Sequence, residues 1–152
     1  MIDTNHKQPI ERPIRVLLAD DYALIRHVLR SLLEEHPNVE VVAEATNGEE
    51  AVMLAERLRP SVVIMDINMP RMNGIQATAK ITARNPELAV IGLSLNEGEH
   101  GDAILRAGAK GFVAKESAVD RLYTAIVEAV TKLGSWRNPS SQRQIEYGTH
   151  LA

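Results

Sequence analysis

Five short apolar runs separated by helical patterns limit the fold of this chain more than any other feature of its sequence. The runs are rich in Val, Ile and Leu and mostly continuous, as in strands buried on both faces of a parallel sheet. The expected strands are residues 14–20, 39–45, 61–66, 88–94 and 111–115. Strands that alternate with helices in this way predict an α/β fold, namely a doubly wound, five-stranded parallel sheet covered by helices on both faces.

Each expected strand is followed by a segment with helical periodicity or helix-capping residues. Asn47, with Glu50 three positions later, is typical of a helix N-cap, and prolines end two of the helices. Gly98 and Gly101 weaken the first turn of the fourth helix by about 1 kcal/mol each relative to alanine. The expected helices are residues 22–36, 47–58, 75–84, 97–107 and 118–133.

The length and composition limit the kinds of function. A chain of 152 residues suits one domain, so we expect an N-terminal tail over 1–13, a domain over 14–133 and a C-terminal tail or interdomain linker over 134–152. A net charge of −3 gives no global signal for nucleic acid or anionic lipid. The absence of cysteine excludes disulfides and thiol chemistry. No apolar run is long enough to span a membrane, so we expect a cytoplasmic protein with no membrane contact.

Polar residues stand at the carboxyl ends of four expected strands, where open α/β sheets place their sites. Asp20 and Asp21 follow the first strand, Asp66 ends the third, Ser94 the fourth and Lys115 the fifth. Three carboxylates that meet repel one another, and Mg²⁺ prefers such oxygen ligands. The set suits phosphoryl transfer onto Asp66, with the metal at the aspartate pair and the hydroxyl and ammonium binding the phosphoryl oxygens.

Four segments together resemble the receiver domain of two-component response regulators. They are LLADD (17–21), VVIMDINMPRMNG (62–74), IGLS (91–94) and AGAKGFVAK (107–115), in the order and with the spacing of that family. Within the second and fourth segments, MPRMNG and AGAKGF most resemble receivers that precede a helix-turn-helix output domain of the nitrate-regulator type. They also resemble receivers of hybrid histidine kinases. The resemblance implies a flavodoxin-like (βα)5 fold with strand order 2-1-3-4-5.

The resemblance also implies a metal and a phosphoacceptor. By it, Asp66 accepts a phosphoryl group from a histidine kinase. Asp21 and Asp66 bind Mg²⁺ directly, together with the backbone carbonyl of Asn68, while Asp20 holds a metal-bound water. Taken alone, Asp20 and Asp21 also suit the simpler role of N-cap and dipole-stabilising acids for the first helix.

The resemblance also implies roles for the remaining site residues, with Ser94 and Phe112 as the conformational switch. Ser94 hydrogen-bonds the phosphoryl group, Lys115 pairs with it, and Phe112 occupies the place of the aromatic residue that changes rotamer. Phe112 departs from the tyrosine of many members, so a switch here rests on packing alone. Leu95 departs from the usual small residue and is expected to crowd the switch or the phosphoryl entrance.

The family resemblance implies a phosphoacceptor that assists its own phosphorylation and dephosphorylation, rather than an enzyme with a separate substrate. Its expected partner is a histidine kinase, a homodimer formed on phosphorylation is left open, and DNA contacts would need an output domain that is not recognisable in residues 134–152. A receiver of a hybrid kinase and a stand-alone receiver are alternatives.

Three other classes of protein fit less well. Phosphatases of the haloacid dehalogenase type use an aspartate nucleophile and Mg²⁺, but usually carry a second aspartate where this chain has Asn68. A nucleotide-binding domain would need a glycine-rich loop after the first strand. A protein that only binds partners would not need an intact acidic site.

Overall fold

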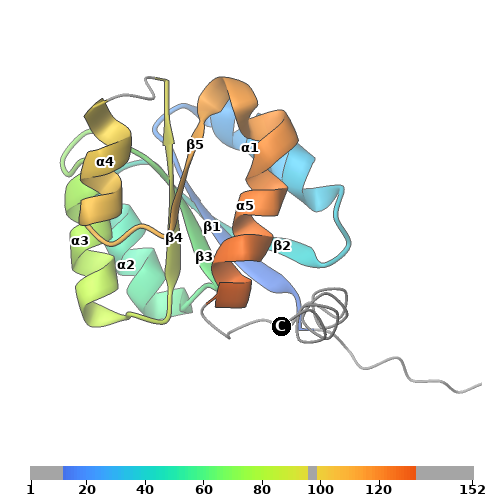
Figure 1. Cartoon of the computed structure of the whole chain (residues 1–152), viewed down its shortest axis with the longest axis horizontal. Helices are drawn as coiled ribbons and strands as arrows, with labels where there is room; N and C mark the ends of the chain where they lie inside the picture. Colours follow the sequence, from blue (N-terminus) through green and yellow to red (C-terminus); the bar gives the residue numbers. More distant parts are fainter. Residues whose placement is uncertain (1–11, 96–98, 133–152) are drawn as a thin grey trace, which may run out of the picture.

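The computed structural model describes residues 12–95 and 99–132, and these form one parallel sheet between two layers of helices (Figure 1). The strands are β1 (Ile14–Ala19), β2 (Val39–Ala45), β3 (Val62–Asp66), β4 (Ala89–Ser94) and β5 (Gly111–Ala114). Their order in the sheet is β2-β1-β3-β4-β5, which confirms the predicted fold class and strand order. All four neighbouring pairs are parallel.

The helices lie close to the predicted segments. They are α1 (Ala23–Glu34), α2 (Gly48–Leu58), α3 (Gly74–Arg84), α4 (Glu99–Arg106) and α5 (Ala118–Lys132), with a short 3₁₀ turn, η1 (Lys115–Ser117), before α5. In Figure 1, α1 and α5 cover one face of the sheet, and α2, α3 and α4 cover the other. The expected tails, and the first residues of the fourth helix, lie largely outside the described residues. None of the described helices has the length and apolar character to cross a membrane.

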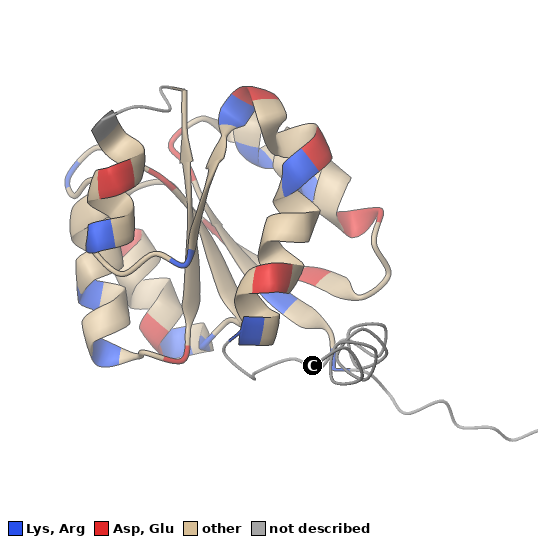
Figure 2. Ribbon diagram, in the orientation of Figure 1, with Lys and Arg blue, Asp and Glu red and all other residues tan. Residues whose placement is uncertain are grey.

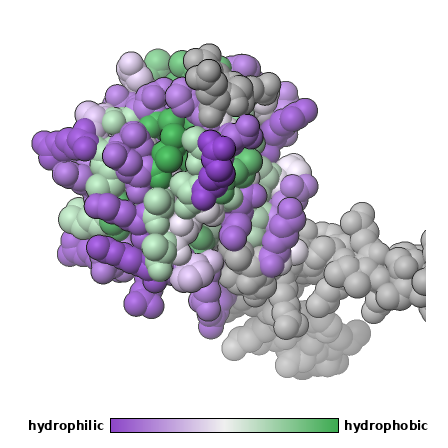
Figure 3. Space-filling model, turned by 60° about the vertical axis from the view of Figure 1, so that its left-hand side comes forward, coloured by the Kyte–Doolittle hydropathy of each residue, from purple (hydrophilic) through white to green (hydrophobic). Residues whose placement is uncertain are grey.

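Two apolar cores form because successive residues of a strand point to opposite faces. Val16 and Leu18 of β1 pack toward α1 and α5, whereas Leu17 and Ala19 pack toward the other helical layer. Every residue of β3 is buried, as expected for the central strand of a doubly covered sheet. The charged residues lie mainly on the helices and loops, outside these cores (Figure 2). Figure 3 shows one face of the molecule, which is mostly hydrophilic with a small hydrophobic strip.

The loop between β3 and α3 is held by close backbone contacts. Gly48 at the start of α2 donates its N–H to the carbonyl of Met72, at 3.0 Å, and Gly74 donates to the carbonyl of Ile67, at 2.8 Å. A Cβ at position 74 would overlap the carbonyl oxygen of Asp66, and one at position 48 would overlap that of Met72. Glycine is therefore required at both positions to let the loop carrying residues 67–73 lie against the sheet and α2.

This close approach predicts the effect of a single methyl group. Gly74→Ala should lower the free energy of unfolding by about 1–3 kcal/mol, because main-chain atoms must move to admit the Cβ. Gly111→Ala is the matched control, since the nearest neighbour of its Cβ is a side-chain carbon of Ile91 at 4.0 Å. Urea unfolding of both variants checks this, and equal stabilities would contradict it.

Candidate functional site

An acidic cluster lies at the carboxyl edge of the sheet. Asp20 and Asp21 follow β1, and Asp66 is the last residue of β3, the strand next to β1. One carboxylate oxygen from each of the three lies within 4.8 Å of those from the other two. Asp20 and Asp66 are buried, whereas Asp21 is exposed. The sheet topology thus brings together two residues of the loop after β1 and the last residue of β3, which are far apart in sequence.

Lys115 binds two of these carboxylates. It follows β5 and opens η1, and its side chain is 13% exposed. Its ammonium lies 3.0 Å from Oδ2 of Asp20 and 3.1 Å from Oδ1 of Asp66. One cation against three carboxylates leaves an excess of negative charge at this edge. The cluster therefore has the chemistry to attract a second cation.

The electrostatics of the site follow from burial and from these charges. Burial raises the pKa of Asp66, the charge of Asp20 raises it further, and Lys115 opposes both, so that the pKa reaches about 6. Burial lowers the pKa of Lys115, but its bonds to Asp20 and Asp66 and their charges outweigh burial and raise it. Near neutral pH, Lys115 is therefore an ammonium and Asp66 is mostly a carboxylate.

The cap predicted for the first helix is wrong in detail. The N-cap residue of α1 is Tyr22, and its side chain makes no capping hydrogen bond. Instead, Oδ1 of Asp20 accepts from the backbone N–H of Tyr22, at 2.9 Å, which closes the turn between β1 and α1. Because α1 begins only at Ala23, neither aspartate stands at the N-cap position. By contrast, Asn47 caps α2 as predicted, accepting from the N–H of Glu50 at 2.8 Å.

Other predicted site residues lie on the same edge of the sheet. Ser94 is the buried last residue of β4 and is aligned with Ala114 of β5. Asn68 is exposed and lies two residues beyond Asp66, in the loop held by Gly74. Leu95 is 69% exposed, so it lies at the surface rather than within the core.

Phe112 is packed against α4 in a way that the sequence did not reveal. Its ring is partly buried, and a Cβ on Gly101 would lie 3.3 Å from it. A Cβ on Gly92 of β4 would also lie 3.3 Å from the ring. Gly101, interpreted from sequence only as a weak point of the helix, thus makes room for the aromatic ring between α4 and the sheet.

The donor set fits a hard cation such as Mg²⁺. All three groups supply oxygen ligands, which Mg²⁺ prefers, and they converge on one small volume. Oδ2 of Asp20 is buried, and the Lys115 ammonium lies 3.0 Å from it. Because this ion pair leaves an excess of negative charge on the three carboxylates, the cluster would gain from a further positive partner.

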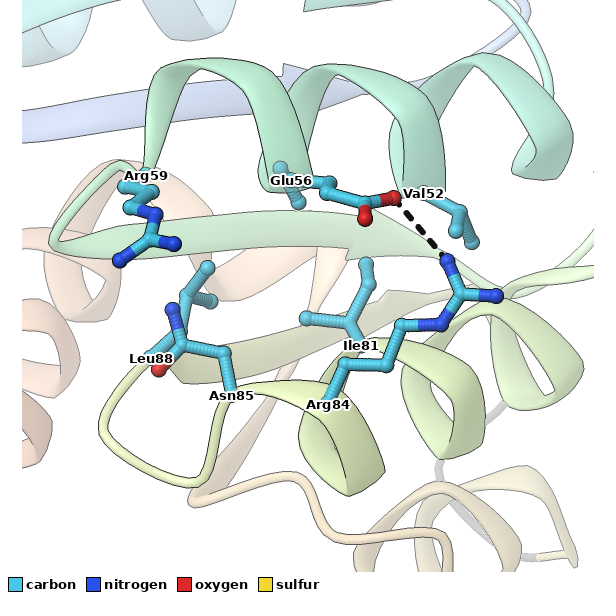
Figure 4. A pocket seen from close by; sticks show the side chains of 8 residues that line it. Val52, Glu56, Arg59, Ile81, Arg84, Asn85 and Leu88 are labelled. Carbon is cyan, nitrogen blue, oxygen red and sulfur yellow. Dashed lines mark hydrogen bonds and ion pairs between the residues drawn. The ribbon is translucent and has the colours of Figure 1, made fainter.

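A separate cavity lies between α2 and α3, near the opposite end of the strands (Figure 4). It has a volume of about 190 Å³, and an ion pair of 3.0 Å between Glu56 and Arg84 spans it. Both helices end here, so Arg59 and Arg84 offset the negative ends of the helix dipoles. These arginines are accounted for by helix termination, and the acidic cluster remains the candidate site.

Comparison with known proteins gives a consistent result. A family model described as the response regulator receiver domain matches residues 16–127. The chain is 37% identical over 135 residues to the transcriptional regulatory protein DegU of Brevibacillus brevis, covering 88% of this chain and 57% of that protein. It is 38% identical over 137 residues to a protein-glutamate methylesterase/protein-glutamine glutaminase of Alkalilimnicola ehrlichii, covering 86% of this chain and 35% of that protein.

A solved structure agrees with these relatives. The signal receiver domain of the response regulator NarL from Mycobacterium tuberculosis is 30% identical and superposes with a TM-score of 0.72. The match covers 79% of this chain and 98% of that one. The match thus includes almost the whole of an isolated receiver domain. By contrast, this chain spans only 57% and 35% of the lengths of the two curated relatives above.

The raised pKa of Asp66 predicts a pH-dependent cost to folding. Because the folded state binds this proton more tightly than the unfolded state, stability is lost as the pH rises from about 4 to about 6. In the presence of a chelator, Asp66→Asn should therefore be more stable than the unmodified protein above pH 6, by about 1–3 kcal/mol. The difference should shrink toward zero near pH 4. Urea unfolding across pH 4–8 measures it, and a less stable variant at pH 7.5 would refute it.

Proposed function

The chain belongs to the response regulator receiver family, and we propose that it acts as a phosphorylation-dependent switch of a two-component system, with Asp66 as the phosphoacceptor. The observation that carries this proposal is the assembly of Asp20, Asp21, Asp66 and Lys115 at one edge of the sheet. A largely buried cluster with unequal charges is costly to the fold, and such clusters are frequent at functional sites.

Asp66 is suited to be the nucleophile. With a pKa of about 6, its carboxylate is mostly ionised near neutral pH. A carboxylate oxygen attacks the phosphorus of a phosphohistidine, the P–N bond breaks, and the imidazole leaves with a proton taken from solvent. The product is an acyl phosphate on Asp66. Lys115, whose ammonium is 3.1 Å from Oδ1 of Asp66, is placed to pair with the new phosphoryl oxygens.

The acidic pair completes the site. Asp21 and Asp66, with the backbone carbonyl of Asn68, would hold Mg²⁺ directly, and Asp20 would hold a water bound to it. When bound, Mg²⁺ supplies positive charge that offsets the phosphoryl oxygens in the transition state. Asp20 keeps its place by accepting from the Tyr22 N–H and pairing with Lys115.

An apolar groove beside the site suits the phosphodonor. It lies between α1 and α5, with Ile25, Val28 and Leu32 on one wall, Val119 on the other and Lys115 at its edge. Apolar side chains of the groove reach the surface, since Val28 is 45% exposed and Val119 is 67% exposed. An amphipathic helix of a histidine kinase that carries the phosphohistidine would fit here with its apolar face on the groove. With a kinase partner of this kind, we propose a cytoplasmic location for the switch.

The proposed signal leaves the site through Ser94 and Phe112. A phosphoryl group on Asp66 offers Ser94 a charge-assisted hydrogen bond that exists only in the modified state. Movement of the end of β4 then changes the space for the Phe112 ring, which rests on Gly101 of α4. The position and order of α4 therefore differ between the two states.

The output of the switch is proposed from the relatives. The DegU relative is a transcriptional regulatory protein, which favours a DNA-binding output domain outside this chain, and the similarity to the NarL receiver supports the nitrate-regulator type. The methylesterase relatives favour, as the second candidate, an enzymatic output domain. In both cases this chain supplies the receiver, and a homodimer of phosphorylated receivers is a further part of the proposal.

Phosphorylation of Asp66 is tested directly with a small phosphodonor. Acetyl phosphate and Mg²⁺ should raise the intact mass by one phosphoryl group, and Asp66→Asn should abolish the increase. Asp102→Asn, an exposed aspartate on α4, is the control and should be labelled normally. Full labelling of Asp66→Asn would show that another residue is the acceptor.

The route of the signal is tested by Ser94→Ala. This variant should still accept a phosphoryl group on Asp66 but transmit little change to α4, because the differential contact is missing. Hydrogen exchange with and without beryllofluoride, a phosphoryl mimic, measures this. If protection of α4 changes as much as in the unmodified protein, the signal leaves by another route.

A further inference from the structure

Arg26 connects helix α1 to the main chain of the acidic loop. Its Nη1 donates to the carbonyl oxygen of Asp20 at 2.7 Å, and its Nε donates to Oε1 of Glu44 at 3.0 Å. The side chain is only 14% exposed, so both bonds are made largely away from solvent. Arg26 was not singled out from the sequence, because its partners lie on two other segments of the chain.

Asp20 is held by four contacts. Its N–H donates to the carbonyl of Ala45, at the end of β2, at 3.0 Å, its Oδ1 accepts from the Tyr22 N–H, and its Oδ2 pairs with Lys115. Arg26 supplies the fourth contact, at the carbonyl, where the chain leaves β1 for Asp21. Ligand loops need such support, since a metal site tolerates displacements of only about half an ångström.

Glu44 orients the arginine. It is on β2, the edge strand beside β1, and its second oxygen accepts from Arg30 at 3.0 Å. Because the charge of Arg26 is balanced by Glu44, its main contribution to the acidic cluster is geometric. A planar guanidinium reaches both acceptors in a fixed fork, which the single ammonium of lysine does not reproduce.

From these contacts we propose that Arg26, oriented by Glu44, is a positioning residue that holds the loop carrying Asp20 and Asp21 in the geometry that binds Mg²⁺. The inference rests on the proposed function of the acidic cluster as a Mg²⁺ site. It assigns no contact between Arg26 and the metal. Replacing a residue that orients metal ligands without touching the metal typically changes the metal affinity.

Arg30 is a matched control on the same helix. It also donates to Glu44, and it pairs with Glu34 at 3.1 Å, but it makes no hydrogen bond to the acidic loop in the part of the chain that the structure describes. Replacing Arg30 therefore removes a cation from the same glutamate and leaves the bond to Asp20 in place. If Mg²⁺ affinity falls in the Arg26 variant but not in the Arg30 variant, the cause is the geometry of the loop and not the loss of a positive charge.

The test is a calorimetric Mg²⁺ titration of the whole chain and of Arg26→Met, Arg26→Lys and Arg30→Met, with thermal melts in chelator. Arg26→Met should raise the Mg²⁺ dissociation constant about tenfold. Arg26→Lys, which keeps the charge but not the fork, should remain weakened, and Arg30→Met should stay within about twofold of the unmodified protein. Labelling of Arg26→Met by acetyl phosphate at saturating Mg²⁺ should still reach completion.

The outcomes separate the two proposals. If the unmodified protein binds Mg²⁺ and all variants bind it equally, or if Arg30→Met is weakened as much as Arg26→Met, the positioning role is wrong while the metal site stands. A lower melting temperature of the Arg26 variants with unchanged Mg²⁺ affinity would likewise overturn it, by showing a role in stability alone. If the unmodified protein binds no Mg²⁺, both proposals fail. If Arg26→Met does not fold, Arg26→Lys decides the comparison.

Discussion

Three carboxylates meet a single ammonium at the carboxyl edge of the sheet, and this unequal set of charges determines the electrostatics of the site. Lys115 lies within 3.1 Å of both buried carboxylates, one from the loop after β1 and one from β3. It therefore joins the outer strand β5, through the start of η1, to the two strands at the centre of the sheet. Burial is what gives these charges their effect, because Asp66 would have an ordinary pKa in water.

Local backbone packing then places the loops that carry the charges. The loop after β3 is held by main-chain contacts at Gly48 and Gly74, where a side chain would not fit. The loop after β1 is held by the Tyr22 N–H, Ala45 and Arg26. The apolar cores on both faces keep the strands in register. Residues at the strand ends therefore meet although they are far apart in sequence. The site is thus a consequence of the sheet rather than an addition to it.

The parts of the fold that could be predicted are those with local causes. Continuous apolar runs indicated five buried strands, and each lies where predicted to within a residue or so at its ends. Asn47 capped its helix as expected, because an N-cap depends on residues only three apart. The first helix begins within one residue of its predicted start but without an aspartate cap, because Asp20 bonds within the preceding turn instead. Strand order came from the family resemblance, since periodicity carries no information on which strands are neighbours.

By itself, the sequence determined the fold class and the identity of the polar residues at the strand ends, because hydrophobic periodicity and motif spacing are written along the chain. Tertiary structure alone decided which of these groups touch. The ion pairs of Lys115 with Asp20 and Asp66, the bond from Arg26 to the carbonyl of Asp20 and the packing of Phe112 on Gly101 join separate elements of the fold. Such contacts, and the raised pKa that follows from burial, exist only after the sheet has brought distant segments together and removed water from between them.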